Sequence, residues 1–269
     1  MIVLPRFLSE RAKMAEVSTV ALLERKPTIS RDLFSRYWRD VHGVMAARIP
    51  GFGTYIQHHV SPLTDVGSVN PEPFEGIALV TYASEADRKG LIKSPITAHM
   101  HRDEQNVFRR ALLYNLGEGK SRPVITSSDA DEPQFFLVVP EGSDPDAVAA
   151  KLQTAGAAAL DLHDLTGGDP GDWNATDVDD GGSGRRFVAV LMTRWAHEAT
   201  ARQAISTAVA TSGGTLAAYR TDARHVMVKD GRPTPLGLRG LDALKTINEA
   251  CAVNQLDHAV EDVIFGHIK

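Results

Sequence analysis

The chain has 269 residues, of which 43% are hydrophobic, which is enough for one large or two modest globular domains. Lysine and arginine number 29 against 34 aspartates and glutamates, a net charge of −5 without a long basic run, so nucleic acid is not expected as a partner. The single cysteine excludes an intrachain disulfide, and no apolar run reaches the length of a signal peptide or membrane span, so we expect a cytoplasmic protein that does not contact a membrane.

The first predicted strand and helix occupy residues 17–49. Residues 17–23 are a continuous run of β-branched and apolar side chains, as a central strand should be. Ser30 is suited to cap the helix that follows, and one stripe along this helix is apolar or aromatic apart from a histidine. The stripe consists of Phe34, Trp38, His42, Met45 and Ile49. His42 is therefore expected to point inward.

A second strand is predicted over residues 52–60, because Pro50 and Gly51 end the helix. Alternation places Tyr55, Gln57 and His59 on one face of this strand and the more apolar set on the other. If the more apolar face packs on the helix, these three side chains look away from the helix, into whatever the opposite face encloses. They would then form a site.

The next elements complete a β-α-β-β-α-β unit. A loop rich in proline and glycine precedes a strand over residues 74–82. Ser84 begins a second helix that Pro95 interrupts, and the second piece runs to about residue 108. Residues 111–116 are predicted as the last strand of the unit.

The pattern then restarts, which indicates a diverged internal duplication. We expect one half over residues 1–120, a linker over 121–133, and a second half with a C-terminal helix over 134–269. Predicted strands cover residues 134–139, 158–165, 187–193 and 215–228, and predicted helices cover 144–155, 195–211 and 240–254. The insert at residues 167–186 is rich in aspartate, but its spacing does not fit an EF-hand, so a flexible surface loop is expected.

The run W-R-D-V-H at residues 38–42, with F-x-x-Y before it and P-G-F and Y-I-Q-H-H after it, resembles the EthD family over roughly residues 17–116. The resemblance implies an α+β fold of ferredoxin-like units whose sheets pair as a dimeric α+β barrel, with a ligand cavity between sheet and helices. Tandem ferredoxin-like repeats would form this α+β barrel within one chain, and a homodimer is left open. Relatives by fold include methylmuconolactone methylisomerase, polyketide cyclases, and fungal enzymes that dehydrate or decarboxylate polyketides, so the fold alone does not choose a reaction.

The candidate site gathers around the W-R-D-V-H run and the strand after it. Candidate catalytic residues are His42, His59 and Tyr55, and candidate substrate-binding residues are Trp38, Tyr37 and Gln57. A histidine side chain can take and return a proton near neutrality, although a core histidine is the alternative for the first of them. A tyrosine and a glutamine on one strand face could hold a carbonyl or phenol oxygen as charge builds on it. A buried tryptophan could form one wall of an aromatic pocket.

We therefore expect a cofactor-independent lyase or isomerase that removes a proton α to a carbonyl in a small aromatic, lactone-bearing or polyketide-like compound. His42 would be the base, and His59 or Tyr55 would stabilise the oxygen and return the proton for elimination, cyclisation or rearrangement. No cofactor and no metal are expected. His99, His101 and Asp103 have the H-x-H-x-D spacing of some metal sites, but on a helix a solvated face is the simpler interpretation. A non-catalytic accessory protein of an oxidative degradation pathway and a haem-binding barrel stay open as alternatives.

Overall fold

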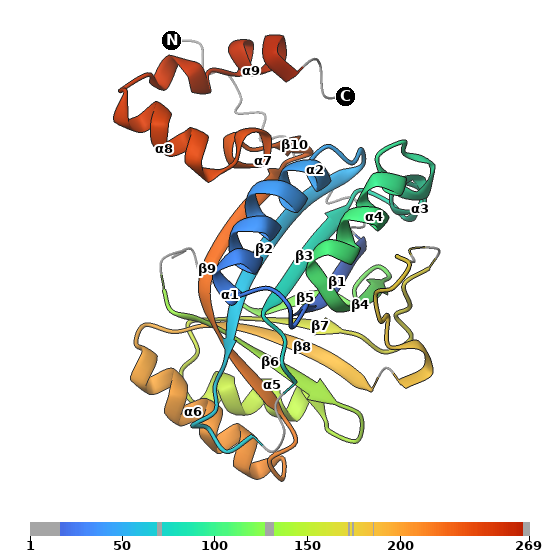
Figure 1. Cartoon of the computed structure of the whole chain (residues 1–269). Coiled ribbons are helices and arrows are strands. Elements are labelled where there is room, and N and C mark those ends of the chain that lie inside the picture. The colour runs from blue at the N-terminus through green and yellow to red at the C-terminus, as the bar shows by residue number, and fades with distance from the viewer. Residues whose placement is uncertain are drawn as a thin grey trace, which may run out of the picture.

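A computed structural model describes residues 17–68, 72–126, 132–171, 173, 175–184 and 186–265. Within this part of the chain, one antiparallel sheet passes through both halves in the order β4-β1-β3-β2-β9-β6-β8-β7-β5, with β10 beside β9. Figure 1 shows helices α1, α2 and α4 over the sheet of the first half, and α5 and α6 over the sheet of the second half. Each half is therefore a two-layer unit of helices on a sheet.

The first half follows the predicted β-α-β-β-α-β order. Its strands are β1 (Val17–Arg25), β2 (Phe52–Pro62), β3 (Gly76–Tyr82) and β4 (Phe108–Leu116). Its first helical region comprises α1 (Arg31–Tyr37), the π-helical segment η1 (Trp38–His42) and α2 (Gly43–Ala46). Its second helical region comprises α3 (Glu85–Gly90), the 3-10 segment η2 (Leu91–Lys93) and α4 (Thr97–Val107). The sheet order β4-β1-β3-β2 is that of a ferredoxin-like unit.

The second half repeats this arrangement. Its strands are β6 (Gln134–Pro140), β7 (Ala159–Asp164), β8 (Phe187–Arg194) and β9 (Ala217–Lys229), and its helices are α5 (Pro145–Thr154) and α6 (Glu198–Thr211). The order β9-β6-β8-β7 corresponds, strand for strand, to that of the first half. The prediction of an α+β class with tandem ferredoxin-like repeats is thus confirmed. Residues 121–125, expected to belong to the linker, instead form β5 (Ser121–Ile125) and pair with β7, while residues 127–131 of that linker lie outside the described residues.

The two halves are joined along one strand pair and across one shared core. Strand β2 pairs with β9, with Tyr55 opposite Val228 at one end and Pro62 opposite Tyr219 at the other. A hydrophobic cluster then combines side chains from both halves of this sheet, including Leu22 from β1 and Phe136 from β6. Because both of these side chains are fully buried, the two halves of the sheet pack face to face within one chain.

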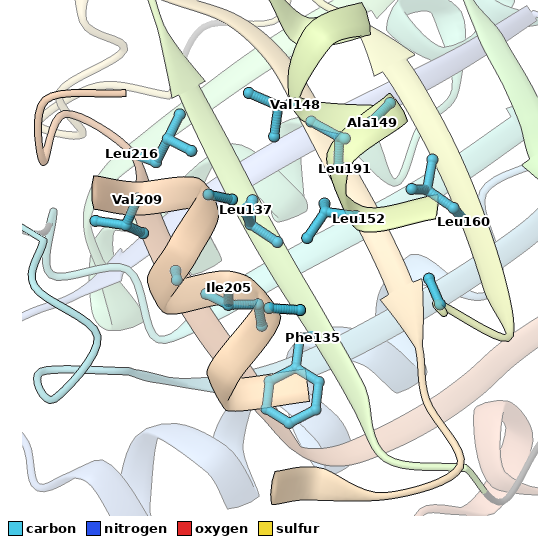
Figure 2. Packing of buried hydrophobic residues seen from close by; sticks show 14 of the residues in the cluster. Phe135, Leu137, Val148, Ala149, Leu152, Leu160, Leu191, Ile205, Val209 and Leu216 are labelled. Carbon is cyan, nitrogen blue, oxygen red and sulfur yellow. The ribbon is translucent and has the colours of Figure 1, made fainter. Parts of the chain in front are cut away.

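The space between sheet and helices differs between the two halves. In the second half it is filled by aliphatic and aromatic side chains from the sheet and from α5 and α6, with Phe135, Leu137, Leu152 and Ile205 completely buried (Figure 2). Burying each such side chain favours folding by about 1.5–3 kcal/mol before its loss of conformational freedom is counted. In the first half, the same space contains the cavity described below.

The C-terminal elements lie outside the barrel. They are β10 (Arg232–Pro233), α7 (Pro235–Arg239), α8 (Leu241–Glu249), the 3-10 segment η4 (Val253–Leu256) and α9 (His258–Phe265), and Figure 1 shows them at one end of the molecule. The backbone N–H of Leu241 donates to the carboxylate of Asp40 at 2.9 Å, which ties the start of α8 to η1. None of the helices in the described part of the chain combines the length and the apolar character that a membrane crossing needs.

Candidate functional site in the first half

The W-R-D-V-H run forms a π-helical turn, η1, between two α-helical pieces. Ser30 caps the first piece, as predicted, by accepting a hydrogen bond from the N–H of Leu33 at 3.1 Å. Single π-turns inside helices are rare and occur frequently at functional sites. Both ends of this turn are buried, since Trp38 is completely enclosed and His42 is 6% exposed. The π-turn therefore places a tryptophan and a histidine together on the inner side of the helix.

Two glycines give this turn the room it needs. A β-carbon at Gly43 would lie 2.5 Å from Nε2 of Gln57, and one at Gly76 would lie 2.7 Å from Cζ3 of Trp38. Such approaches are closer than any van der Waals contact, so larger residues would push η1 away from β2 and β3. Glycine at both positions lets the helix lie directly on the sheet.

The polar face of β2 packs on this helix. Gln57 donates from Nε2 to the carbonyl oxygen of Trp38 at 2.8 Å and to the hydroxyl of Tyr55 at 2.9 Å. The ring of His59 stacks on the indole of Trp38 with centroids 4.6 Å apart, and its Nδ1 shares a 2.7 Å hydrogen bond with the hydroxyl of Ser35. The expectation that this face looks away from the helix is therefore wrong.

The shared core between the two halves of the sheet explains this orientation. On the opposite face of β2, Val60 is completely buried in that core and His58 lies edge-on to Phe136 at 4.9 Å. The helix, in contrast, offers a backbone carbonyl and a serine hydroxyl, which satisfy the polar groups of Gln57 and His59. The more apolar face thus turns to the other half of the chain, and the more polar face turns to the helix.

A histidine–aspartate pair joins η1 to α4. Nδ1 of His42 lies 2.9 Å from Oδ2 of Asp103, and the hydroxyl of Tyr37 donates to Oδ1 of the same carboxylate at 2.5 Å. Burial would raise the pKa of Asp103, but the hydrogen bonds from His42 and Tyr37 outweigh it and lower the pKa below the usual range. Asp103 therefore keeps its negative charge beside the imidazole.

The other ring nitrogen of His42 is available. Nε2 has no hydrogen-bond partner among the described residues, and the ring lines a cavity. Phe108 meets the ring edge-to-face, with centroids 5.3 Å apart, and restricts its orientation. An imidazole fixed by a carboxylate on one nitrogen and open on the other can act as a general base.

The H-x-H-x-D spacing on α4 does not form a metal site. Asp103 points to His42, while Nδ1 of His99 is hydrogen-bonded to Arg102 at 2.9 Å and His101 lies edge-on to Trp173 at 4.6 Å. Within the described part of the chain, no group of three histidine, cysteine or carboxylate side chains is arranged to hold a metal ion. One residue of this spacing, Asp103, is instead the hydrogen-bond partner of His42.

The cavity lies between the first sheet and its helices and has a volume of about 540 Å³. Its aromatic walls are Trp38, Phe52, Tyr55, Tyr82, Phe108 and Trp173. Its polar groups include Thr19, His42, Glu104 and Asn115, and charged side chains of α3, among them Arg88, also line it. The volume and the mixture of aromatic walls with few polar groups are typical of a small-molecule site.

The insert of the second half also lines the cavity. Asp169, Pro170 and Trp173 line it, and the insert is fastened to the edge of β4 by backbone hydrogen bonds. Asn115 donates to the carbonyl of Asp169 at 3.0 Å, and Ala111 donates to that of Asp179 at 2.9 Å. These residues, expected in a flexible surface loop, instead pack on the first half, and the second half completes the cavity wall. A tryptophan in an otherwise polar insert is the sequence signal that could have indicated this.

One functional candidate, Glu104 on α4, was absent from the predicted set. It is 6% exposed and lines the cavity, and its two carboxyl oxygens accept hydrogen bonds from Nε1 of Trp173 at 3.1 and 3.3 Å. Burial, with a smaller effect from the charge of Asp103, raises the pKa of Glu104 to about 8. Glu104 lies four residues after Met100, which also lines the cavity. This helical spacing is the only pattern in the sequence that could have suggested that the side chain of Glu104 points into the cavity.

The six predicted site residues thus divide into two groups. His42, Trp38 and Tyr55 line the cavity. Tyr37, Gln57 and His59 lie behind them and hold Asp103, Tyr55 and Trp38 respectively. Burial raises the pKa of Tyr55 far above its ordinary value, so its hydroxyl keeps its proton and can donate it in a hydrogen bond. The catalytic and binding roles of all six stay predictions.

The fold and this site define an α+β barrel protein with a cavity in its first half. Residues 26–110 match the family model of the EthD domain, so the first half of the chain carries an EthD domain. No curated protein matches the chain at a significant level.

Solved structures similar to this chain have very different sequences. An anthrone oxidase-like protein is 11% identical, with 81% of this chain and 96% of that chain covered and a TM-score of 0.46. A candidate monooxygenase from Fusobacterium nucleatum is 8% identical, with 81% and 97% covered and a TM-score of 0.44. Chlorite dismutase from Candidatus Nitrospira defluvii, in complex with imidazole, is 9% identical, with 77% and 92% covered and a TM-score of 0.39. These values are too low to transfer an activity.

Proposed function

We propose that this protein is a cofactor-independent enzyme of the lyase or isomerase kind, which moves protons on a small aromatic or polyketide-like carbonyl compound. The observation that carries the proposal is the pair of His42 and Asp103, 2.9 Å apart, at the wall of a cavity of about 540 Å³. The aromatic walls favour a planar substrate, because rings pack well on flat apolar faces.

In the proposed reaction, Nε2 of His42 removes a proton from the carbon next to the substrate carbonyl. The carboxylate of Asp103 holds the imidazole by Nδ1 and stabilises the positive charge that the ring acquires. Tyr37 fixes the carboxylate from its other oxygen. The same imidazole can return the proton at another position, which would give an isomerisation.

The negative charge that develops on the substrate oxygen needs a hydrogen-bond donor. Tyr55 is suited to this task, because its hydroxyl accepts a hydrogen bond from Gln57 at 2.9 Å and keeps its own proton to donate. His59 does not line the cavity, so in this proposal it supports Trp38 and takes no part in proton transfer. These assignments replace the broader role expected for His59 from the sequence.

The test is the replacement of His42 by asparagine, which keeps polarity and approximate size but cannot shuttle a proton. Wild type and variant are incubated in D2O with small aryl ketones, aryl lactones and aryl β-hydroxy ketones, and exchange of the α-hydrogen is followed by NMR. We expect the exchange rate to fall by about a hundredfold or more in His42→Asn. His99→Asn, a matched change at an exposed histidine of α4, should leave the rate unchanged. Equal exchange by wild type and a folded His42→Asn variant would contradict the proposal.

Haem binding is the second candidate, and the same pair of residues supports it. A histidine that binds a metal usually bonds a carboxylate through its other ring nitrogen, as His42 does. His42 would then hold the haem iron, and haem would supply redox chemistry. The corresponding space of the second half is filled by side chains (Figure 2), so it has no room for such a group. A visible spectrum after adding haem to wild type and His42→Asn separates the two candidates, since only a His42-ligated haem gives a Soret band that the variant changes.

A further inference from the structure

Glu104 is a titratable group on the cavity that the proton transfer proposed above does not use. Its carboxyl group is buried, and among the described residues its hydrogen-bond partner is the indole N–H of Trp173. No lysine, arginine or histidine in the described part of the chain forms an ion pair with it. A buried carboxyl group without a positive partner is stabilised in its neutral, protonated form.

Burial and the negative charge of Asp103 favour the neutral form of Glu104, and the hydrogen bond from Trp173 opposes them. Asp103 precedes it on α4 and carries a negative charge, and the other titratable side chains of this helix are His99, His101 and Arg102. From η1, His42 lines the same cavity but is engaged by Asp103. The hydroxyl of Tyr55 on β2 is electrically neutral, and the insert contributes the acidic side chain of Asp180 to a small pocket beside Glu104.

Adjacent residues of α4 thus have opposite protonation states near neutral pH. Asp103 accepts two hydrogen bonds and has a lowered pKa, whereas Glu104 accepts bonds from a neutral indole and has a pKa of about 8. Two acidic groups whose environments separate their pKa values in this way are typical of a site that uses one as a charge and the other as an acid. Their side chains also point differently, since only Glu104 lines the cavity.

We infer that Glu104 is the general acid of this site and that the reaction is the elimination of water from a β-hydroxy carbonyl compound. This inference rests on the proposed function of His42 and extends it. A base alone suffices for proton exchange or isomerisation, but a hydroxyl group leaves slowly unless an acid protonates it. The cavity offers a base on η1 and a protonated acid on α4.

Nε2 of His42 takes the proton from the α-carbon, and the electron pair of that C–H bond becomes the C=C bond. The bond between the β-carbon and the hydroxyl oxygen breaks, and the leaving oxygen takes the proton of Glu104 and departs as water. His42 now carries one proton more and Glu104 one fewer, so a proton passed between them through water restores both groups.

Trp173 is a positioning residue for this acid. Its N–H reaches both carboxyl oxygens, at 3.1 and 3.3 Å, and it comes from the insert of the second half. Because the hydrogen bond favours the charged form, it lowers the pKa of Glu104 relative to burial alone. Replacing Trp173 by phenylalanine should therefore raise the pKa of Glu104 further and shift the alkaline limb of the elimination rate to higher pH.

The protonation state is tested without a substrate by infrared spectroscopy. Wild type should show the C=O band of a protonated carboxyl at neutral pH, and the difference from Glu104→Gln should isolate it. The band should disappear with a midpoint near pH 8. Glu118→Gln, at an exposed position in the turn after β4, should leave this band unchanged. A wild-type spectrum without a protonated carboxyl that Glu104→Gln removes would overturn the inference.

The chemistry is tested with the aldol adduct of benzaldehyde and acetone, which loses water to give a conjugated enone that absorbs ultraviolet light. Exchange of its α-hydrogen in D2O needs the base, whereas formation of the enone needs base and acid. We expect Glu104→Gln to retain exchange and to lose elimination by about 10²–10⁴-fold, while His42→Asn loses both. Wild type that exchanges the α-hydrogen but forms no enone, or a Glu104→Gln variant that forms it at the wild-type rate, overturns the inference and leaves the proposed function standing. Wild type that does neither contradicts both.

Discussion

Replacing Asp103 by asparagine would remove one negative charge from the site while keeping the side-chain volume. In the structure, this carboxylate accepts hydrogen bonds from the hydroxyl of Tyr37 at 2.5 Å and from Nδ1 of His42 at 2.9 Å. Tyr37 and His42 bond different oxygens of the carboxylate, and asparagine has an NH₂ group in place of one of them, so it can accept from only one partner in its present position. Either Tyr37 must turn its hydroxyl, or the proton of His42 must move to Nε2, the nitrogen that faces the cavity.

The structure predicts a moderate loss of stability and a large loss of the α-hydrogen exchange rate in Asp103→Asn. A hydrogen bond to a charged group contributes about 1.5–3 kcal/mol, so losing one from this buried network should lower the free energy of unfolding by about that amount. A small domain is typically stable by about 5–15 kcal/mol, so the variant should still fold. The rate of α-hydrogen exchange should fall further, by about 10²–10⁴-fold, because the base loses both its orientation and the charge that stabilises its protonated form.

The effect on stability should depend on pH in one direction. The pKa of Asp103 is lower in the folded protein than in the unfolded chain, where an aspartate has a pKa of about 3.9. The carboxylate therefore contributes stability above that pH, and this contribution is lost as the pH falls through the lower, folded value. The difference in unfolding free energy between wild type and Asp103→Asn should be constant near neutrality and shrink in strong acid.

The assay combines urea unfolding, α-hydrogen exchange, and ¹⁵N NMR of the imidazole to report which nitrogen carries the proton. Asp40→Asn is the matched control, because this half-buried aspartate of the same helix is paired with Arg39 and lies at the start of α8. The control should lose some stability and keep the wild-type exchange rate. An Asp103→Asn variant with the wild-type rate and an unchanged imidazole tautomer would refute the role assigned to the pair.

Two further predictions concern packing and acid. Gly76→Ala should destabilise the protein by about 1–3 kcal/mol in urea unfolding, because its β-carbon would lie 2.7 Å from the indole of Trp38; an unchanged unfolding free energy would show that the ring can move. Burial lowers the pKa values of His58 and His59 to about 3, so both stay neutral in the folded protein while the unfolded chain takes up protons below a pKa of about 6.5. The unfolding free energy should therefore decrease by up to about 3 kcal/mol per pH unit from about pH 6 to pH 4, and His58→Gln should reduce this slope; equal stability at both pH values would contradict the assignment.

Local sequence patterns determined most of the secondary structure. The three- and four-residue spacing predicted His42 on the inner face of the helix, and His42 is buried there although the helix contains a π-turn. This spacing defines the buried stripe of a helix independently of the element that packs on it. Ser30 and Ser84 begin helices where expected, because a cap needs only a side-chain oxygen and the first turn. The repeated order of strands and helices likewise predicted two ferredoxin-like units, since each unit is built from neighbouring segments.

Only the tertiary structure decided which groups meet at the site. Alternation sorted the side chains of β2 into two faces, but the choice of face for Gln57 depended on the second half of the chain, whose core took the opposite face. Asp103 is separated from His42 by 61 residues, and Trp173 is separated from Glu104 by 69. Helical and strand periodicity carries no information over such separations, because it reports only which side of an element is buried and not what lies against that side. The partners of the base and of the acid were therefore set by the packing of α4 on η1 and of the insert on β4.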